Sequence, residues 1–300
     1  MNSIATFKAL ADETRILLYN ILLTKELNVN ELVEVMSMGQ SRISRHLKIL
    51  TDAGLLTSRR DGLWVFYKAI GETNPIEKNL QEILKSDSDL LKDLQLRDEV
   101  LQERLSQKTQ YFNSIASQWD NMKEDLFGDL HLDNEILPYI NEDSIVADLG
   151  CGTGELMATL LQKASQVIGV DSSSRMLEEA KSRLESFDQR VDLRIGEIEH
   201  LPMRDQEIDH GVISMVLHHL PSPQEALYET SRVVKNSLII AELDKHNRED
   251  FRRLYGHRWL GFDKDEILTW LHDAGYKKCI SESYTVKSGM KVNIFIAQHK

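Results

Sequence analysis

The sequence predicts an α/β fold in which a small winged helix-turn-helix module precedes a doubly wound, Rossmann-like parallel sheet. Apolar residues recur at helical spacing over residues 4–50, and residues 55–68 then read as a β-hairpin around an Asp-Gly pair. From residue 144 onward, short apolar runs alternate with helical segments, a pattern typical of parallel sheets. A turn with glycine at positions 150, 152 and 154 follows the first of these runs.

Composition and cysteine content restrict the class of protein. With 300 residues, 41% of them apolar and 28% charged, the chain fits an ordinary globular protein of two domains. No apolar run approaches the roughly 18 residues of a membrane span, and the amphipathic N-terminus is no signal peptide, so we expect no membrane partner. Cys151 and Cys279 are too few for a disulfide framework or a cysteine metal cluster. We therefore expect a cytoplasmic location.

Three segments are expected along the chain. Residues 1–74 hold the helix and hairpin patterns, residues 75–122 form a helical connector, and residues 123–300 hold the glycine turn and the apolar runs. Thr73-Asn74-Pro75 is a helix-start signal, because proline fits the first turn of a helix. Leucines at helical spacing along the connector indicate a packing surface, whose partner is either a second copy of the chain or its own C-terminal domain.

Residues 40–50 predict a helix with two different faces. Met38-Gly39-Gln40 supplies a turn, and Ser41 is the candidate N-cap. Ile43, Leu47 and Leu50 form an apolar stripe, and polar and basic side chains lie opposite it. This arrangement is typical of the second helix of a helix-turn-helix.

Basic residues concentrate around this helix, although the whole chain carries a net charge of −12. Residues 38–68 hold six basic and two acidic side chains, a net charge of +4. A hairpin turning at Asp61-Gly62 adds a wing, and a basic helix beside a wing favours double-stranded DNA as partner. The alternative is a packing module that no longer binds DNA. The predicted DNA contacts are Gln40, Ser41, Arg42, Ser44, Arg45, His46 and Lys48 on the helix, and Arg59 and Arg60 on the hairpin.

Two stretches carry a resemblance to a known family. Residues 8–16 (KALADETRI) and 44–55 (SRHLKILTDAGL) strongly resemble ArsR-type winged helix-turn-helix repressors. The resemblance implies operator DNA as partner and a homodimer built from the first and last helices. Metal sensors of that family use cysteine on the helix before recognition, or histidine and aspartate on the last helix. Residues 27–37 hold neither cysteine nor histidine and residues 76–106 hold no histidine, so the sequence predicts no metal site.

The glycine turn predicts a nucleotide-type ligand. It follows an apolar run that ends at Asp148, and it precedes a helix whose free N–H groups favour a carboxylate. A dinucleotide fingerprint needs a third glycine at residue 155, which is Glu155. The pattern Asp-x-Gly-x-Gly-x-Gly instead resembles the first motif of class I S-adenosylmethionine-dependent methyltransferases.

Later motifs extend this resemblance over about 190 residues. Asp171 lies 21 residues beyond Gly150, where such folds place an acid for the ribose hydroxyls, although it also fits as the cap of the next helix. The resemblance implies S-adenosylmethionine or S-adenosylhomocysteine as cofactor. The cofactor-binding residues it implies are Asp148, Gly150, Cys151, Gly152, Gly154, Asp171, Ser172, Met176, Glu197, Ile198 and Ser214, with Tyr111 and Trp119 from an opening helix. The two aromatic residues fit a core role equally well.

The catalytic residues remain unassigned by the sequence. His218, His219, His257 and Tyr111 are candidates for a base, but adjacent histidines also fit plain packing. ArsR-type regulators fused to methyltransferase domains resemble the SahR group, which is associated with the methionine and S-adenosylhomocysteine cycle. Three interpretations follow: a regulator with a nucleoside effector, an active small-molecule methyltransferase, and a methyltransferase with a structural dimerisation module. We expect the first.

Overall fold

The computed structural model describes residues 3–70, 84, 88–120, 122, 131–286 and 289–299. The chain forms two compact units, Met1–Gln107 and Lys108–Lys300. The expected connector 75–122 is therefore shared between the two units, and its expected start at residues 73–75 lies outside the described residues. Each unit has its own buried apolar core.

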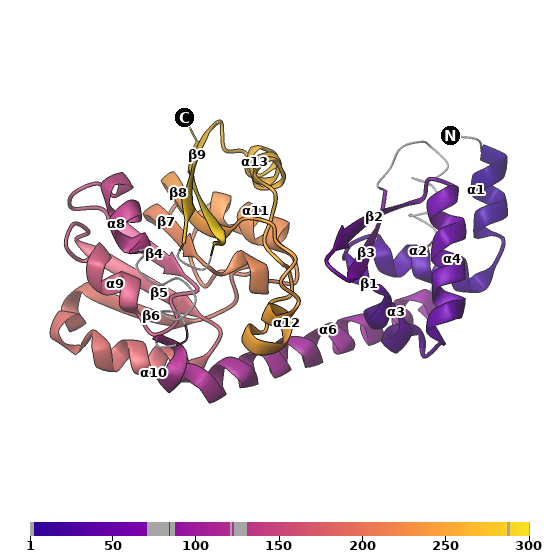
Figure 1. The fold of residues 1–300 in the computed structure, drawn as a ribbon, viewed down its shortest axis with the longest axis horizontal. Helices are drawn as coiled ribbons and strands as arrows, with labels where there is room; N and C mark the ends of the chain where they lie inside the picture. The colour runs from indigo at the N-terminus through magenta and orange to yellow at the C-terminus, as the bar shows by residue number, and fades with distance from the viewer. Residues whose placement is uncertain are drawn as a thin grey trace. The chain divides into compact units, whose positions relative to one another are not determined.

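The first unit is a winged helix-turn-helix (Figure 1). Its helices are α1 (Ser3–Leu10), α2 (Glu13–Leu22), α3 (Val29–Met36) and α4 (Gln40–Asp52), and its strands are β1 (Leu27–Asn28), β2 (Leu56–Asp61) and β3 (Trp64–Ala69). The strands form an antiparallel sheet in the order β1-β3-β2. The long helix α6 (Ser88–Ile115) follows, and Val100 on it joins the core made by α2, α3 and α4.

The N-cap residues show where α3 and α4 begin. Asn28 and Glu31 form a reciprocal capping box at the start of α3, which leaves residues 27–28 to the sheet. Helix α4 begins at Gln40 with Gly39 as its N-cap. The assignment of Ser41 as N-cap was therefore wrong, because Ser41 already lies inside the helix.

The wing is a tight hairpin with a small shift from expectation. Asp61 pairs with Trp64, so the turn residues are Gly62 and Leu63 rather than Asp61 and Gly62. Gly62 has a φ of 57°, which suits glycine at the first position of a two-residue hairpin turn. The hairpin itself is confirmed.

The second unit contains a seven-stranded sheet in the order β6-β5-β4-β7-β8-β10-β9. The first five strands in that order are parallel, and β10 runs antiparallel to both of its neighbours. Their bounds are β4 (Ile145–Leu149), β5 (Gln166–Asp171), β6 (Val191–Ile195), β7 (Ile208–Ser214), β8 (Val234–Leu243), β9 (Lys278–Thr285) and β10 (Lys291–Gln298). The expected doubly wound α/β fold is confirmed.

Helices cover both sides of this sheet. Figure 1 shows α8 (Leu132–Ile136) and α9 (Glu155–Leu160) on one side, and α11 (Pro223–Val233) and α13 (Lys264–Asp273) on the other. Helix α10 (Ser174–Arg183) packs along β5 and β6, and α12 (Asp250–Tyr255) follows β8. Short 3-10 turns lie at Ala116–Gln118, Leu137–Tyr139 and Leu217–His219, and a 3-10 segment with a kink at Phe187 covers Glu185–Arg190. Strand β8 begins at Val234, directly after α11 ends at Val233.

No helix in the described part of the chain combines the length and the apolar character needed to cross a membrane.

Candidate functional site

The glycine turn lies at the carboxyl end of β4, between that strand and α9. Gly150, Gly152 and Gly154 have φ values of 85°, 51° and 76°, a region that strongly favours glycine. A Cβ on Gly150 would stand 2.6 Å from Cγ2 of Val216, and one on Gly154 would stand 3.0 Å from Cβ of Ala180. Both backbone angle and space therefore require glycine at the two outer positions.

Asp171 at the end of β5 is held by the glycine turn itself. The Gly152 amide donates to Asp171 Oδ2 over 3.0 Å, and the Ser173 amide donates to Asp171 Oδ1 over 2.8 Å. Helix α10 is capped by Ser173, whose hydroxyl oxygen accepts from the Met176 amide. Asp171 is thus not the cap of α10. A carboxylate has about four acceptor sites, so backbone donors can orient it while ribose hydroxyls also bind.

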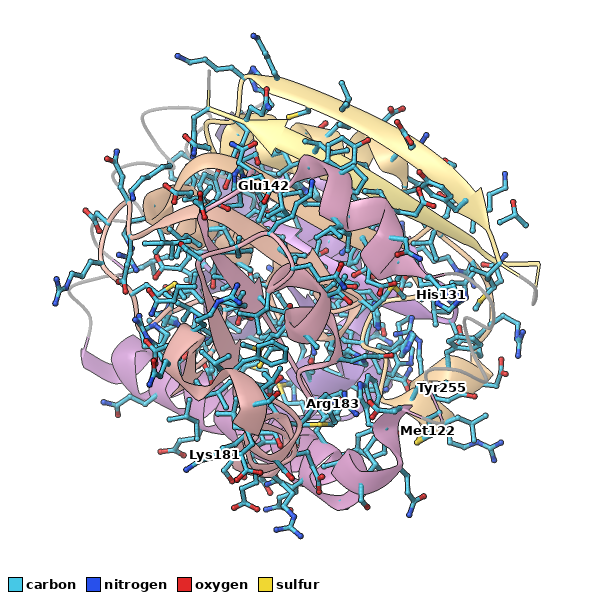
Figure 2. The ribbon with its side chains drawn as sticks, turned by 90° about the vertical axis from the view of Figure 1, so that its left-hand side faces the viewer. Met122, His131, Glu142, Lys181, Arg183 and Tyr255 are labelled. Carbon is cyan, nitrogen blue, oxygen red and sulfur yellow. The ribbon has the colours of Figure 1, made fainter. Side chains whose placement is uncertain are left out.

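Residues 111–120, which include the C-terminal end of α6, are fastened to the glycine turn. The Ser173 hydroxyl lies 2.6 Å from Asn113 Oδ1, and the Thr153 hydroxyl lies 2.7 Å from Asp120 Oδ1. Arg183 on α10 forms an ion pair with Asp120 and also donates to the Thr153 hydroxyl over 3.0 Å (Figure 2). These bonds close residues 111–120 over the carboxyl ends of β4 and β5.

A row of aromatic rings runs from the glycine turn to His219, which lies in the 3-10 turn after β7. A Cβ on Gly152 would lie 3.6 Å from Trp119 Nε1. The Trp119 ring meets Phe112 edge-on with centroids 5.5 Å apart, and Phe112 meets His219 edge-on at 5.0 Å. Sequence reasoning missed Phe112, although it stands next to Tyr111. The Tyr111 hydroxyl donates to the Leu254 carbonyl on α12, which also carries Tyr255, labelled in Figure 2.

The remaining predicted cofactor residues lie around the same edge of the sheet. Asp148, Cys151, Met176 and Ile198 are buried, and Ser172, Glu197 and Ser214 are half-buried. The pKa of the Cys151 thiol is raised well above its ordinary value, mainly because the thiol is buried and also because the carboxylates of Asp148 and Asp171 are near. Cys151 is therefore a neutral packing group rather than a nucleophile.

The four catalytic candidates converge near the end of β7. His218 and His219 form the 3-10 turn that follows this strand, and Met215 just before it has a φ of 60°, a strained value for a bulky side chain. His257 follows α12, and its ring centroid lies 4.0 Å from that of His218. Tyr111 lies against Gly256, where an added Cβ would stand 3.4 Å from the Tyr111 ring.

Hydrogen bonds fix these histidines in place. His218 Nδ1 lies 2.6 Å from Oε1 of Glu242, a carboxyl group on β8 that is fully buried. His219 Nδ1 lies 3.2 Å from the Gly256 carbonyl oxygen. The His218 carbonyl accepts from the backbone amides of Arg258 and Trp259, which ties the chain after α12 to the end of β7. Glu242 was not predicted, and only its place near the carboxyl end of β8 could have indicated it.

The predicted DNA-binding residues divide into two groups. Gln40, Ser41, Arg42, Ser44, Arg45 and Lys48 on α4 and Arg60 on the wing are exposed. The guanidinium groups of Arg42 and Arg45 make neither a hydrogen bond nor an ion pair with any residue that the structure describes, whereas the Lys48 side chain pairs with Asp52 over 3.0 Å. The exposed face of α4 thus presents two basic groups available for phosphates or base edges.

His46 and Arg59 are placed differently from the other predicted contacts. His46 is 9% exposed and its Nδ1 lies 3.7 Å from Asp12 Oδ1, which puts its ring on the buried side of α4. That position does not fit a DNA contact. Arg59 is half-buried and pairs with Glu26 over 3.4 Å.

Comparison with known families matches both units. A model described as "Bacterial regulatory protein, arsR family" matches residues 12–58, and a model described as "Methyltransferase domain" matches residues 147–240. The chain carries an ArsR-family helix-turn-helix at residues 12–58 and a methyltransferase domain at residues 147–240. Both predicted resemblances are confirmed.

Curated relatives match parts of the chain only. An uncharacterised protein of a Streptomyces fradiae transposon is 39% identical over 32% of this chain and 29% of its own length. A demethylmenaquinone methyltransferase of Lactiplantibacillus plantarum is 35% identical over 41% of this chain and 56% of its own length. A ubiquinone biosynthesis O-methyltransferase of Coxiella burnetii is 29% identical over 41% and 55%. The chain thus spans about half the length of these two enzymes, and less of the transposon protein.

Solved structures agree with the fold of the second unit. A chain of the Haloferax volcanii Trm112–methyltransferase complex has a TM-score of 0.52, with 19% identity, and covers 63% of this chain and 98% of its own. An S-adenosylmethionine-dependent methyltransferase of Thermotoga maritima has a TM-score of 0.51, with 19% identity and the same coverage. These structures show a shared fold.

Proposed function

We propose that this protein is a DNA-binding transcriptional regulator whose methyltransferase domain binds S-adenosylmethionine or S-adenosylhomocysteine as an effector. The observation that carries the proposal is the presence, in one chain, of an exposed basic face on α4 and a glycine turn tied to Asp171. The first feature suits a duplex and the second suits an adenosyl ligand.

The DNA-binding half of the proposal rests on α4. Ile43, Leu47 and Leu50 are fully buried, so the helix has a fixed rotation and its other face is turned to solvent. That face carries Arg42 and Arg45, and arginine is the side chain best suited to bidentate contacts with phosphates and with guanine. The half-buried Arg59 is paired with Glu26, so we assign the backbone contact of the wing to Arg60.

The proposed effector site lies at the carboxyl ends of β4 and β5, next to residues 111–120. The adenosyl ligand would lie along bare backbone at Gly150 and Gly152, with its ribose hydroxyls on Asp171. The adenine would lie beside half-buried Glu197 and buried Ile198. Residues 111–120 would close over the ligand, because their bonds to Thr153 and Ser173 hold them there. Effector coupling requires unequal ligand affinity in two DNA-binding states.

We also propose a homodimer. Ile4 and Phe7 on α1 are 64% and 60% exposed, an unusual position for large apolar side chains on an eight-residue helix. A second copy packed through α1 would cover them. Two-fold symmetry would then present two α4 helices to the half-sites of a palindromic operator.

The regulated genes would be those of the methionine and S-adenosylmethionine cycle, since the effector is the cofactor or the product of that cycle. Regulation of transcription places the protein in the cytoplasm, and two free thiols fit a reducing compartment.

Calorimetry tests this proposal. S-adenosylmethionine and S-adenosylhomocysteine are each titrated into the full chain, and both titrations are then repeated in the presence of promoter DNA. Because coupling between two ligands is reciprocal, the nucleoside that acts as effector must show a different Kd when the DNA is bound. Equal Kd values with and without DNA for both nucleosides would remove the effector role.

A second candidate function is supported by one specific contact. Glu242 Oε1 lies 2.6 Å from His218 Nδ1, and this contact orients the His218 ring so that Nε2 is the nitrogen left to accept a proton. A base near the methyl donor would serve an active methyltransferase with a hydroxyl or an acidic carbon as acceptor. The relatives named for menaquinone and ubiquinone biosynthesis support a quinone-type acceptor. Turnover of such an acceptor, with no effect of either nucleoside on DNA binding, would favour this function instead.

A further inference from the structure

Three buried imidazole rings lie close together near the carboxyl end of β7. His218, His219 and His257 are 2%, 6% and 4% exposed, and one ring nitrogen from each lies within 4.8 Å of the others. They come from two segments that are almost forty residues apart in the sequence, the 3-10 turn after β7 and the loop after α12. The pairing of Arg258 and Trp259 amides with the His218 carbonyl holds these two segments together.

Hydrogen bonds define the tautomers of two of the rings. The Gly256 carbonyl can only accept, so His219 Nδ1 carries the proton and His219 Nε2 carries a lone pair. Glu242 accepts from the backbone amides of His218 and Leu243, so its oxygens act as acceptors and His218 Nδ1 is the donor in the 2.6 Å contact with Oε1. In the neutral ring, His218 Nε2 then carries a lone pair as well. A carboxylate or a carbonyl behind each ring is the arrangement that usually supports metal-binding histidines.

The third ring and the local charge point the same way. His257 Nδ1 is buried, and no hydrogen bond reaches it from the described residues. Glu242 adds a negative charge that is fully buried. A buried polar group without a partner is unfavourable, and a divalent cation would satisfy the ring and the charge together.

We propose that His218, His219 and His257 form a binding site for a divalent transition-metal ion of the zinc type. Imidazole nitrogen suits zinc, cobalt, nickel and copper better than it suits magnesium or calcium. Three histidines leave one tetrahedral position for a water molecule or for a ligand oxygen. The site lies in the methyltransferase domain and is distinct from the sensor positions that ArsR-type repressors use.

The distances allow this coordination with small side-chain rotations. Zinc bonds nitrogen at about 2.0–2.1 Å, which places two tetrahedral ligand nitrogens about 3.3 Å apart. One ring nitrogen from each histidine lies within 4.8 Å of one from each of the other two. Rotations of the rings would close the difference, and Glu242 and Gly256 would guide the rings of His218 and His219. The metal would occupy the Nε2 lone pair that the second candidate function uses as a base, so the two roles exclude each other.

Cobalt binding tests the proposal in the full-length, untagged protein after treatment with a chelator. Co²⁺ bound by three histidines in a tetrahedral site has intense visible absorption bands, which zinc abolishes on displacement. We expect one equivalent of Co²⁺ to produce these bands and Zn²⁺ to remove them. His257→Gln should lower the Co²⁺ affinity at least tenfold. Glu242→Gln should lower it about 10- to 100-fold, because it removes the group that supports His218. His272→Gln, at an exposed position on α13, is the matched control and should bind as the wild type does.

Absence of the bands in the wild type would overturn the proposal, as would equal Co²⁺ affinity in the wild type and in folded His257→Gln. If His257→Gln does not fold, the thermal unfolding of the wild type decides. Binding to the native state raises Tm with increasing Zn²⁺, and an unchanged Tm at saturating Zn²⁺ would equally contradict the site. Because neither measurement involves DNA or a nucleoside, failure here leaves the regulator proposal intact.

Discussion

The backbone amide of Gly152 donates a hydrogen bond of 3.0 Å to Asp171 Oδ2. This bond joins the two motifs that the sequence places 19 residues apart, the glycine turn after β4 and the acid after β5. It fixes the Asp171 carboxylate beside the bare backbone on which an adenosyl ligand would lie. The side chain and the turn therefore act as a single binding surface.

Replacement of Asp171 tests that surface directly. We expect Asp171→Ala to weaken both nucleosides about 10- to 100-fold, because a hydrogen bond to a charged group is worth about 1.5–3 kcal/mol. Calorimetry measures the loss. Asp273→Ala on exposed α13 is the control and should leave the Kd unchanged. Equal affinities of Asp171→Ala and the wild type would refute the assignment of the ribose site.

The glycine turn provides a stability test with an internal control. Gly150→Ala would push a methyl group against Val216 at a φ of 85°, so we expect a loss of about 1–3 kcal/mol in the free energy of unfolding and no measurable nucleoside binding. Gly39 has an ordinary φ of −64° and open space around its Cβ position. Gly39→Ala should therefore cost less than Gly150→Ala, about 1 kcal/mol at most, since alanine is a weaker N-cap than glycine but meets no neighbouring atom there. Denaturant titrations compare the two variants, and similar losses in both would contradict the model of the turn.

The exposed face of α4 predicts a change in salt dependence. Replacement of Arg42 and Arg45 by alanine should weaken DNA binding by about 1–3 kcal/mol for each arginine that reads a base. Where the contacts are to phosphates, the slope of log K against log salt should become shallower by about one for each. Arg253→Ala on α12 removes one exposed positive charge from the other unit and is the control, which should leave affinity and slope nearly unchanged. A double variant with unchanged affinity and slope would show that α4 is not the reading helix.

Acid stability depends on His210 in this structure. Burial lowers the pKa of His210 below its ordinary value of 6.5, and its Nδ1 lies 2.7 Å from the Ser237 hydroxyl. Because the unfolded chain binds the proton at a higher pH than the folded chain, stability is lost as the pH falls below 6.5. His210→Gln should lose less stability than the wild type between pH 7.5 and pH 5.5 in urea titrations. His272→Gln, with an exposed ring, should follow the wild type, and identical pH profiles for all three would contradict the burial effect.

Periodicity and glycine spacing predicted the parts of the fold that depend on local sequence. The stripe of Ile43, Leu47 and Leu50 gave the correct burial of α4, because a helix repeats every 3.6 residues. Strands β4 and β5 were recognised from apolar runs that end in an acid, although β4 continues one residue past Asp148 to Leu149. Strands β9 and β10 were not assigned, because the sequence reading stopped at β8 and an antiparallel return carries no ligand motif.

The tertiary contacts of the site were beyond the reach of the sequence. Nothing in the spacing links Glu242 to His218, since Glu242 lies on β8 and His218 lies in the turn after β7, and the strand order makes these two strands neighbours. His46 stands among polar residues in the sequence, yet the helix rotation turns it toward Asp12. The absence of a metal site was predicted from cysteine counts and from two helical segments. That reasoning could not detect His257 beside His218 and His219.

The most direct test of the regulator proposal is fluorescence anisotropy of labelled promoter DNA, titrated with the wild type and with Asp171→Ala. At saturating S-adenosylhomocysteine or S-adenosylmethionine we predict a 5- to 150-fold change in the Kd of the wild type for DNA, which corresponds to about 1–3 kcal/mol of coupling. Asp171→Ala should bind DNA as the wild type does without nucleoside and should show no such change. An identical DNA Kd with and without either nucleoside, under conditions where calorimetry shows the nucleoside bound, would contradict the account.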